Sequence, residues 1–333
     1  MKRRQFLAAS AAAIAVPQAA RGQQRSAMRR LAVFNPAASG ADMSATGSPR
    51  YRAFFEELRR LGHVEGSNMV VHRGAAEGRA ERLPQVARET VAFRPDVVFA
   101  VSNRAVEPLR AVAKSIPIVG LVADPVGFGY ASSLARPGGN ITGFAIDTGR
   151  EFVEKHIELL KELVPRASRI AVLIPRDAWE GKVGVFYRAA AAAVGITSVP
   201  ALLEPPADEK EYRRVISGAV RDRVDALYVM AAPENFERRQ IVAALAAEAR
   251  LPALYTTREH VEAGGLMAYT LDFVDVYRRL ATYVGQIFNG ANPATMPFQQ
   301  PEKFHLIVNL KTAKSLDLAI PNTLLARMDE VIE

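Results

Sequence analysis

Asp124 and Pro125 are the residues of this chain whose types and position most directly suggest ligand chemistry. They follow an apolar segment, residues 118–122, that has the length and composition of a buried strand. Ligands of open α/β sheets bind beyond the carboxyl ends of the strands, where the carboxylate of Asp124 would accept a ligand ammonium group. Asp-Pro is also a common turn opener, so a turn-capping role for Asp124 is an equally good interpretation.

Polar side chains follow the other predicted strands in the same way. Each is a weak indication by itself, because loops are polar in any protein. Together they surround one predicted cleft, and they are Asn35, Ser102, Asn103, Arg176, Asp177, Glu234, Asn235, Tyr255, Thr256 and Arg258. The aromatic side chains available as walls of that cleft are Phe128, Tyr130, Trp179, Phe236 and Tyr255.

The residue patterns that support catalysis or cofactor binding are missing from the sequence. Its five histidines are scattered, no two stand at metal-ligand spacing, and there is no cysteine. A Gly-x-Ser-x-Gly elbow for a serine nucleophile is absent as well. Gly127 and Gly129 lack the third glycine of a dinucleotide-binding loop. We therefore expect no enzyme, no metal and no cofactor.

Three strand-like heptapeptides of the first half of the chain have counterparts in the second half. The pairs are RLAVFNP at 30–36 and RIAVLIP at 169–175, RPDVVFA at 94–100 and RVDALYV at 223–229, and SIPIVGL at 115–121 and RLPALYT at 250–256. The offsets of 139, 129 and 135 residues are far larger than the ~20–50 residues of a solenoid repeat. They predict two copies of one α/β domain with a ligand cleft between them.

Strand and helix patterns alternate along most of the chain. Runs such as residues 97–101 are apolar on both faces, which a parallel sheet covered by helices on each side requires. The helix predicted at 51–61 has its apolar residues at helical spacing, and Gly62 ends it. We predict an α/β fold of two similar doubly wound parallel-sheet domains.

The first 22 residues have the composition of an export signal. Lys2, Arg3 and Arg4 precede a short apolar run that ends near the small residues Ala19 and Ala20. The run is too short to cross a bilayer, and the adjacent arginines resemble a twin-arginine signal. An exported protein without cysteine has neither a disulfide framework nor a lipid-anchored cysteine. We expect a soluble periplasmic protein without a lipid anchor.

Charge excludes another class of partner. The whole chain carries a formal charge of +8, and removing the four basic residues of the signal leaves +4. This modest excess, without a stripe of Lys and Arg among aromatics, argues against nucleic acid. No later apolar run approaches the ~20 residues of a membrane span. A monomer that is not embedded in a membrane is expected.

Longer segments of the chain resemble a known family. They are DPVG at 124–127, SLARPGGNITG at 133–143, LLKELVP at 159–165, EAGGLM at 262–267 and FHLIVNLKTAK at 304–314. These resemble the ABC-transporter substrate-binding proteins of type I periplasmic-binding-protein fold, in the subgroup that includes binders of aromatic amino acids. The resemblance covers residues 31–333.

The resemblance implies two lobes joined by three crossings. It places residues 30–143 and 270–292 in the N-terminal lobe, and residues 144–269 and 300–333 in the C-terminal lobe. The crossings are predicted near residues 143–145, near residues 268–271, and in the linker 292–301.

The resemblance also implies roles for single residues. Asp124 matches the family's Asp-Pro at the cleft and would bind an α-ammonium group. Ser102 and Asn103 stand where the family more often has a Gly-Thr-Pro-like turn. Arg176 falls where a Trp-Asn-Pro-like sequence is more usual, and its guanidinium would clamp a carboxylate.

The implied function is that of a solute receptor of an ABC importer, which closes around a small solute and presents it to a membrane permease. The predicted binding residues are Asn35, Ser102, Asn103, Asp124, Pro125, Arg176, Asn235 and Tyr255. An amino acid or another small carboxylate with an apolar part is the favoured solute. A periplasmic ligand-sensing subunit of a membrane signalling system would use the same closure and is the alternative.

Overall fold

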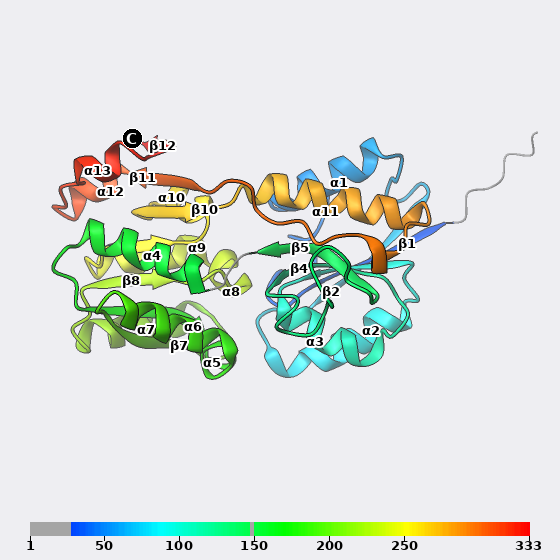
Figure 1. Cartoon of the computed structure of the whole chain (residues 1–333), viewed down its shortest axis with the longest axis horizontal. Helices are drawn as coiled ribbons and strands as arrows, with labels where there is room; N and C mark the ends of the chain where they lie inside the picture. The colour runs from blue at the N-terminus through cyan, green and yellow to red at the C-terminus, as the bar shows by residue number, and fades with distance from the viewer. Residues whose placement is uncertain (1–27, 147–149) are drawn as a thin grey trace, which may run out of the picture.

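The structure is a computed structural model that describes residues 28–146 and 150–333. It consists of two lobes lying side by side (Figure 1). The predicted export signal, residues 1–22, lies outside the described residues.

The first lobe is built on a sheet of five parallel strands. Their spatial order is β2-β1-β3-β4-β5. The strands are β1 (Arg29–Asn35), β2 (Met69–Ala75), β3 (Val97–Val101), β4 (Ile118–Ala123) and β5 (Ile141–Ile146). Strand β3 is buried along its whole length, as expected for the interior of a sheet with helices on both faces.

The second lobe contains a sheet of seven strands in the order β12-β11-β10-β9-β8-β6-β7. They are β6 (Arg169–Pro175), β7 (Thr197–Leu203), β8 (Ala226–Val229), β9 (Ala253–Tyr255), β10 (Met267–Thr270), β11 (His305–Asn309) and β12 (Glu330–Ile332). Strand β11 pairs antiparallel with β10, and the short β12 pairs with β11. The sequence patterns did not predict β12 or this antiparallel pairing.

The sheet topology explains the sequence repeat. The order β2-β1-β3-β4-β5 of the first lobe recurs as β7-β6-β8-β9-β10 in the second. The three repeated heptapeptides contribute to β1 and β6, to β3 and β8, and to β4 and β9. The predicted pair of similar doubly wound domains is confirmed.

Helices cover both faces of each sheet. In the first lobe α1 (Pro49–Arg60) and α11 (Phe273–Phe288) pack on one face, and α2 (Leu83–Ala92) and α3 (Asn103–Val112) on the other. The second lobe has α4 (Arg150–Leu163) and α6 (Lys182–Ala193) on one face, and α7 (Glu209–Arg221) and α9 (Arg239–Glu248) on the other. The shorter helices are α5 (Arg176–Glu180), α8 (Pro233–Glu237), α10 (Arg258–Glu262), α12 (Leu310–Ser315), α13 (Asn322–Leu325) and the 3₁₀ turns η1 (Ala80–Arg82) and η2 (Pro293–Thr295).

Backbone contacts show on which lobe the chain lies near each of the predicted crossings. Strand β5 continues to Ile146 in the first sheet, so residues 144–146 lie with the first lobe and not with the second. The backbone of Gln299 bonds to Gly143 and Ala145 of β5, which holds this part of the linker 292–301 against the first lobe. Between β10 and α11 the chain passes from one lobe to the other at residues 271–272.

Candidate functional site

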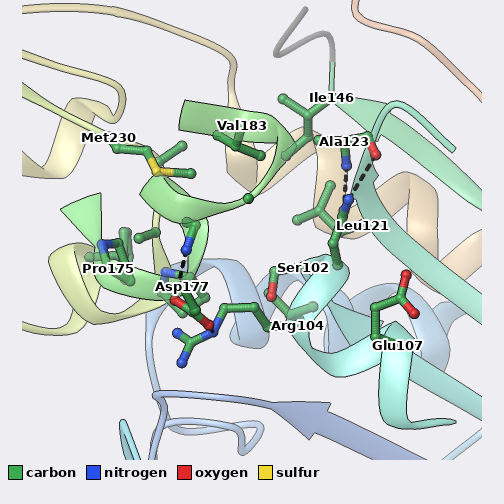
Figure 2. A pocket seen from close by; sticks show the side chains of 18 of the residues that line it. Ser102, Arg104, Glu107, Leu121, Ala123, Ile146, Pro175, Asp177, Val183 and Met230 are labelled. Carbon is green, nitrogen blue, oxygen red and sulfur yellow. Dashed lines mark hydrogen bonds and ion pairs between the residues drawn. The ribbon is translucent and has the colours of Figure 1, made fainter. Parts of the chain in front are cut away.

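A pocket of about 480 Å³ lies between the lobes. Its first-lobe residues lie at or after the carboxyl ends of β1 to β5, with Phe273 added from the start of α11. Its second-lobe residues lie at or after the carboxyl ends of β6, β8 and β9, and Figure 2 shows part of this lining. Ligands of doubly wound sheets bind at these strand ends. The volume lies within the ~300–1,000 Å³ typical of small-molecule sites.

Most of the pocket wall is apolar. Its larger apolar side chains include Val101, Leu121, Phe128, Met230, Phe236 and Phe273. Of the five aromatic walls predicted from the sequence, Phe128 and Phe236 line this pocket, whereas Tyr130, Trp179 and Tyr255 lie elsewhere. The pocket therefore suits a solute with an apolar body.

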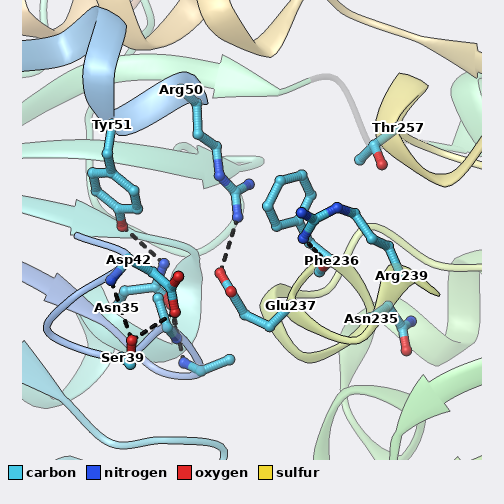
Figure 3. A network of polar contacts seen from close by, with 12 residues as sticks. Asn35, Ser39, Asp42, Arg50, Tyr51, Asn235, Phe236, Glu237, Arg239 and Thr257 are labelled. Atoms are coloured by element: carbon cyan, nitrogen blue, oxygen red, sulfur yellow. Dashed lines mark hydrogen bonds and ion pairs between the residues drawn. The ribbon is translucent and has the colours of Figure 1, made fainter. Parts of the chain in front are cut away.

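A buried arginine, Arg50, is among the residues that line the pocket. Arg50 is in the first turn of α1, and its side chain is only 6% exposed. Its Nη2 donates to Oε1 of Glu237 in the second lobe at 3.2 Å, and its Cζ lies 3.1 Å from the centroid of the Phe236 ring. Figure 3 shows this guanidinium joined to Glu237 and beside the Phe236 ring. Within the described residues, Nε of Arg50 has no hydrogen-bond partner.

Burial also affects the partner of Arg50. It raises the pKa of the Glu237 carboxyl, an effect that the nearby Arg50 guanidinium opposes. Glu237 is therefore a poorly solvated carboxylate whose negative charge Arg50 and, to a smaller extent, Arg239 stabilise. A second carboxylate near Arg50 would compete with it for the same donors.

A second arginine crosses between the lobes at another part of the pocket. Arg104, in the first turn of α3, donates through Nη1 to Glu234 Oε1. Its Nε forms an ion pair with Asp177 Oδ2 at 2.9 Å, although the N–H points away from the ideal direction, since Nε has no hydrogen-bond partner within the described residues. Figure 2 shows Arg104 and Asp177 facing each other.

The start of α3 presents Ser102 and Asn103 to the pocket. Ser102 has φ +75° and ψ 160°, a conformation that strongly favours glycine and often marks functional sites. Its buried Oγ has no hydrogen-bond partner among the described residues. Asn103 uses its amide to hold the end of β4, donating to Ala123 O at 3.0 Å and accepting from Ala123 N at 2.8 Å.

Two other predicted site residues, Asn35 and Asn235, are buried and form hydrogen bonds that hold the loops after β1 and β8. The Nδ2 of Asn35 donates to the Tyr51 hydroxyl at 2.9 Å. In the second lobe, Oδ1 of Asn235 accepts from the Tyr212 hydroxyl at 3.1 Å. Both asparagines are fully buried and lie outside the pocket lining. Figure 3 shows Asn35 directed at Tyr51.

Asp124 and Pro125 form a turn. Oδ1 of Asp124 accepts from Gly127 N at 2.8 Å, and the carbonyl oxygen of Pro125 accepts from Tyr130 N at 2.7 Å. Neither residue lines the pocket. This geometry matches the turn-capping alternative that the sequence left open.

The remaining two predicted residues also lie outside the main pocket. Arg176 is exposed and forms ion pairs with Glu180 and Glu204. Tyr255 belongs to the core of the second lobe and stacks on His260, with ring centroids 4.8 Å apart. Of the eight predicted binding residues, the structure thus brings Ser102 and Asn103 together in the main pocket and places the other six outside it. That any of the eight contacts a solute remains a prediction.

Across residues 28–146 and 150–333, no three His, Cys, Asp or Glu side chains are grouped as metal ligands would be. Within the same ranges no helix combines the length and apolar character needed to cross a membrane.

Residues 48–332 match the family described as ABC transporter substrate binding protein. The chain belongs to this family. The resemblance predicted from the sequence segments is confirmed, and the family is one of substrate-binding proteins, not of enzymes.

Named relatives of this substrate-binding protein match it over most of its length. A tyrosine-binding protein of Clostridioides difficile is 24% identical over 268 residues, 80% of this chain and 76% of the relative. A conserved domain protein of Vibrio cholerae is 25% identical with a TM-score of 0.79, covering 91% of this chain and 99% of that one. The structure of an ABC domain in complex with L-Trp from Streptococcus pneumonia is 22% identical with a TM-score of 0.77 and the same coverage.

Sequence reasoning missed both cross-lobe arginines of the substrate-binding protein. Arg50 and Arg104 each occupy the first turn of a helix. A cation there is unfavourable because the helix dipole is positive at its N-terminus. Arg176 and Arg258 also begin helices that follow strands, yet their ion pairs stay within the second lobe. The position in the first turn therefore does not by itself single out Arg50 and Arg104.

Proposed function

We propose that this substrate-binding protein is the receptor of an ABC importer and captures a small organic carboxylate with an apolar body between its lobes. Arg50 is the observation that supports the carboxylate most directly. A guanidinium has five N–H donors, and within the described residues Arg50 directs one hydrogen bond at Glu237. The remaining donors suit a carboxylate, which pairs with a guanidinium through two parallel bonds.

Ser102 supports the same ligand class. Its unpartnered Oγ and strained backbone lie at the start of α3, in the pocket that Arg50 also lines. A polar solute group would supply the hydrogen bond that the buried hydroxyl lacks.

The apolar walls supply the rest of the affinity. Micromolar binding needs about 8 kcal/mol, and a hydrogen bond to a charged group contributes only ~1.5–3 kcal/mol. The contacts of a solute with Arg50 and Ser102 are therefore not enough for micromolar affinity. The rest of the binding free energy must come from burying the solute's apolar body against side chains such as Phe236 and Met230.

Amino acids are the favoured carboxylates. Relatives named for binding tyrosine and found with L-Trp support an aromatic amino acid. An amino acid brings an ammonium group as well, and the carboxylate of Glu107 lines the same pocket. Asp124 is not needed for this role.

The importer role rests on the family and on the N-terminal sequence. A twin-arginine-like signal would deliver the mature protein to the periplasm, where a receptor meets both its solute and a membrane permease. Closure of two lobes around a solute requires no covalent chemistry.

A calorimetric and thermal-shift comparison of the mature protein tests the proposal. L-Tryptophan and L-tyrosine should raise its melting temperature, since a ligand at a hundredfold over its Kd stabilises the folded state by ~2.7 kcal/mol. Tryptamine and tyramine, which lack the carboxylate, should bind much more weakly. Indole-3-propionate keeps the indole ring and the carboxylate of tryptophan but lacks its ammonium group. Its affinity therefore shows how much the carboxylate contributes without the ammonium group.

A shift with a sugar but none with amino acids or carboxylates would contradict the proposed ligand class. Co-purification with a signalling kinase instead of an ABC permease would favour the sensor alternative.

A further inference from the structure

A second chamber of about 200 Å³ lies beside the main pocket. The two cavities share four lining residues, Ala80, Arg104, Pro175 and Asp177. Among these four, Arg104 has the longest side chain, and it reaches across from the first lobe to Glu234 and Asp177 in the second. Arg104 therefore stands on the boundary between the cavities.

The side chamber is acidic. Its lining includes the carboxylates of Asp177, Glu180, Glu204 and Glu234, against the two guanidinium groups of Arg104 and Arg176. Arg176 pairs with Glu180 and Glu204, which leaves Asp177 and Glu234 to Arg104. One cation thus holds two carboxylates at the boundary.

Glu234 depends on this cation most strongly. Its side chain is 5% exposed, and Oε1 accepts from Arg104. Its Oε2 has no hydrogen-bond partner within the described residues. A buried carboxylate with an unfilled acceptor is a strong site for a cation, and here the guanidinium of Arg104 occupies it.

We propose that Arg104 is a specificity-determining residue that closes the main pocket against the acidic side chamber. Its guanidinium takes the place that the cationic end of a longer solute would occupy. The inference rests on the proposed function, because it concerns the solute held in the main pocket. It adds that the solute ends at Arg104 and carries no cationic group there.

Truncation of Arg104 should allow the protein to bind solutes with a cationic end, which Arg104 excludes in the wild type. In Arg104→Ala the two cavities join, and Asp177 and Glu234 lose their shared cation. A guanidinium compound that enters from the pocket would restore both ion pairs. The variant should therefore gain affinity for ethylguanidinium, which replaces the missing part of the side chain, and for L-arginine.

The first measurement is the melting temperature of the mature protein in millimolar ethylguanidinium chloride, with sodium chloride at equal ionic strength as the reference. We expect a rise of about 2 °C or more for Arg104→Ala and no rise for the wild type. Arg213→Ala is the matched control, because Arg213 also bridges two carboxylates, Glu209 and Glu248, but on the exposed outer surface. It should show no ethylguanidinium-dependent rise.

A second variant separates volume from charge. Arg104→Ala combined with Glu234→Gln opens the same space without leaving Glu234 as a buried charge, so it also serves if the single variant does not fold. Calorimetry should show that the single variant prefers L-arginine to the neutral L-citrulline, and that the double variant loses this preference. Equal stabilisation of both variants by ethylguanidinium, or no gain in either, would overturn the proposal.

These readouts distinguish the inference from the proposed function. Rescue by ethylguanidinium does not depend on which solute the protein carries. Binding of L-tryptophan or L-tyrosine to the wild type tests the proposed function alone.

Discussion

The two facing surfaces of the lobes, or walls, carry different charges where they meet around the interlobe pocket, although both lobes share one strand order. The first lobe extends the guanidinium groups of Arg50 and Arg104 across the gap. The second lobe receives them with the carboxylates of Glu237, Glu234 and Asp177. Duplication preserved the scaffold, and the difference between the copies lies in the first turns of helices and in short loops.

This difference gives the pocket two properties. Opposite charges attract the lobes toward each other where both are poorly solvated. Because Arg50 is already paired with Glu237, a solute carboxylate must compete with Glu237 for its N–H donors. Binding then replaces one ion pair with another.

The largest effect is expected from removing the cation of the first wall. Arg50→Ala should weaken binding of a carboxylate solute by about 3 kcal/mol or more, because loss of one partner of a buried charge pair costs ~2–5 kcal/mol. Isothermal titration with the tightest amino acid of the ligand screen measures this loss.

Arg50→Lys is the matched variant, since it keeps the charge but not the planar fork. It should recover part of the affinity. Wild-type affinity in Arg50→Ala would remove Arg50 from the binding site.

The stability of the second lobe should depend on pH, because a buried histidine supports α8, the helix that carries Glu234 and Glu237. Nε2 of His260 donates to the carbonyl oxygen of Asn235 in α8 at 3.0 Å, and the Thr257 hydroxyl donates to its Nδ1 at 2.7 Å. Burial lowers the pKa of His260 from 6.5 to about 3. The folded protein therefore keeps this imidazole neutral.

The sign of the effect follows from linkage. Above pH 6.5 the imidazole is neutral in both states, and its contribution to stability is fully present. As the pH falls from 6.5 toward 3, the unfolded chain binds a proton that the folded chain does not, and stability is lost. Between pH 6.5 and 5 the loss is about 2 kcal/mol.

Urea unfolding of the wild type and of His260→Gln at pH 7 and pH 5 measures this contribution. The variant should lose less stability on acidification than the wild type. An identical pH dependence would show that His260 does not titrate between the states.

A smaller effect of opposite sign is expected from the acidic partner of Arg50. Glu237→Gln removes the competing carboxylate, so a carboxylate solute should bind up to about tenfold tighter, roughly 1.4 kcal/mol. A titration with the same amino acid used for Arg50→Ala gives the comparison. Weaker binding would mean that Glu237 positions Arg50 and does not compete for it.

The smallest effect concerns Asp124, which belongs to neither wall. Asp124→Ala removes the bond to Gly127 N and should lower the free energy of unfolding by about 1 kcal/mol. Solute affinity should stay unchanged in the same titration. A loss of affinity with unchanged stability would return Asp124 to the binding site.

Much of the fold could be predicted because its signals are local. Strands such as β3 are apolar on both faces, and the repeated heptapeptides occupy equivalent positions in the two sheets. The antiparallel pairing of β11 could not be predicted, because it depends on where the chain returns from the first lobe. β12 has only three residues, too few to give a pattern.

The candidate site was harder to predict, because a polar residue at a strand end can turn inward or toward the cleft. Asn35 and Asn235 turn inward to tyrosine hydroxyls, and nothing in their own sequence positions indicates this. Ser102 and Asn103 remain at the pocket because they begin α3 directly after β3. Arg50 and Arg104 reach the opposite lobe, and such contacts become visible only when the lobes are placed together.

The position of α11 has a consequence for biosynthesis. This helix lies late in the sequence, yet it completes the core of the first lobe, where Tyr277 packs edge-on against Tyr51 and Phe99 at centroid separations of 5.2 and 5.3 Å. A growing chain that contains only β1 to β5 leaves that apolar surface uncovered until residue 288 has been synthesised. Domains usually fold one after another as they leave the ribosome. Here the first lobe must wait for most of the second, so the two lobes complete their folding together.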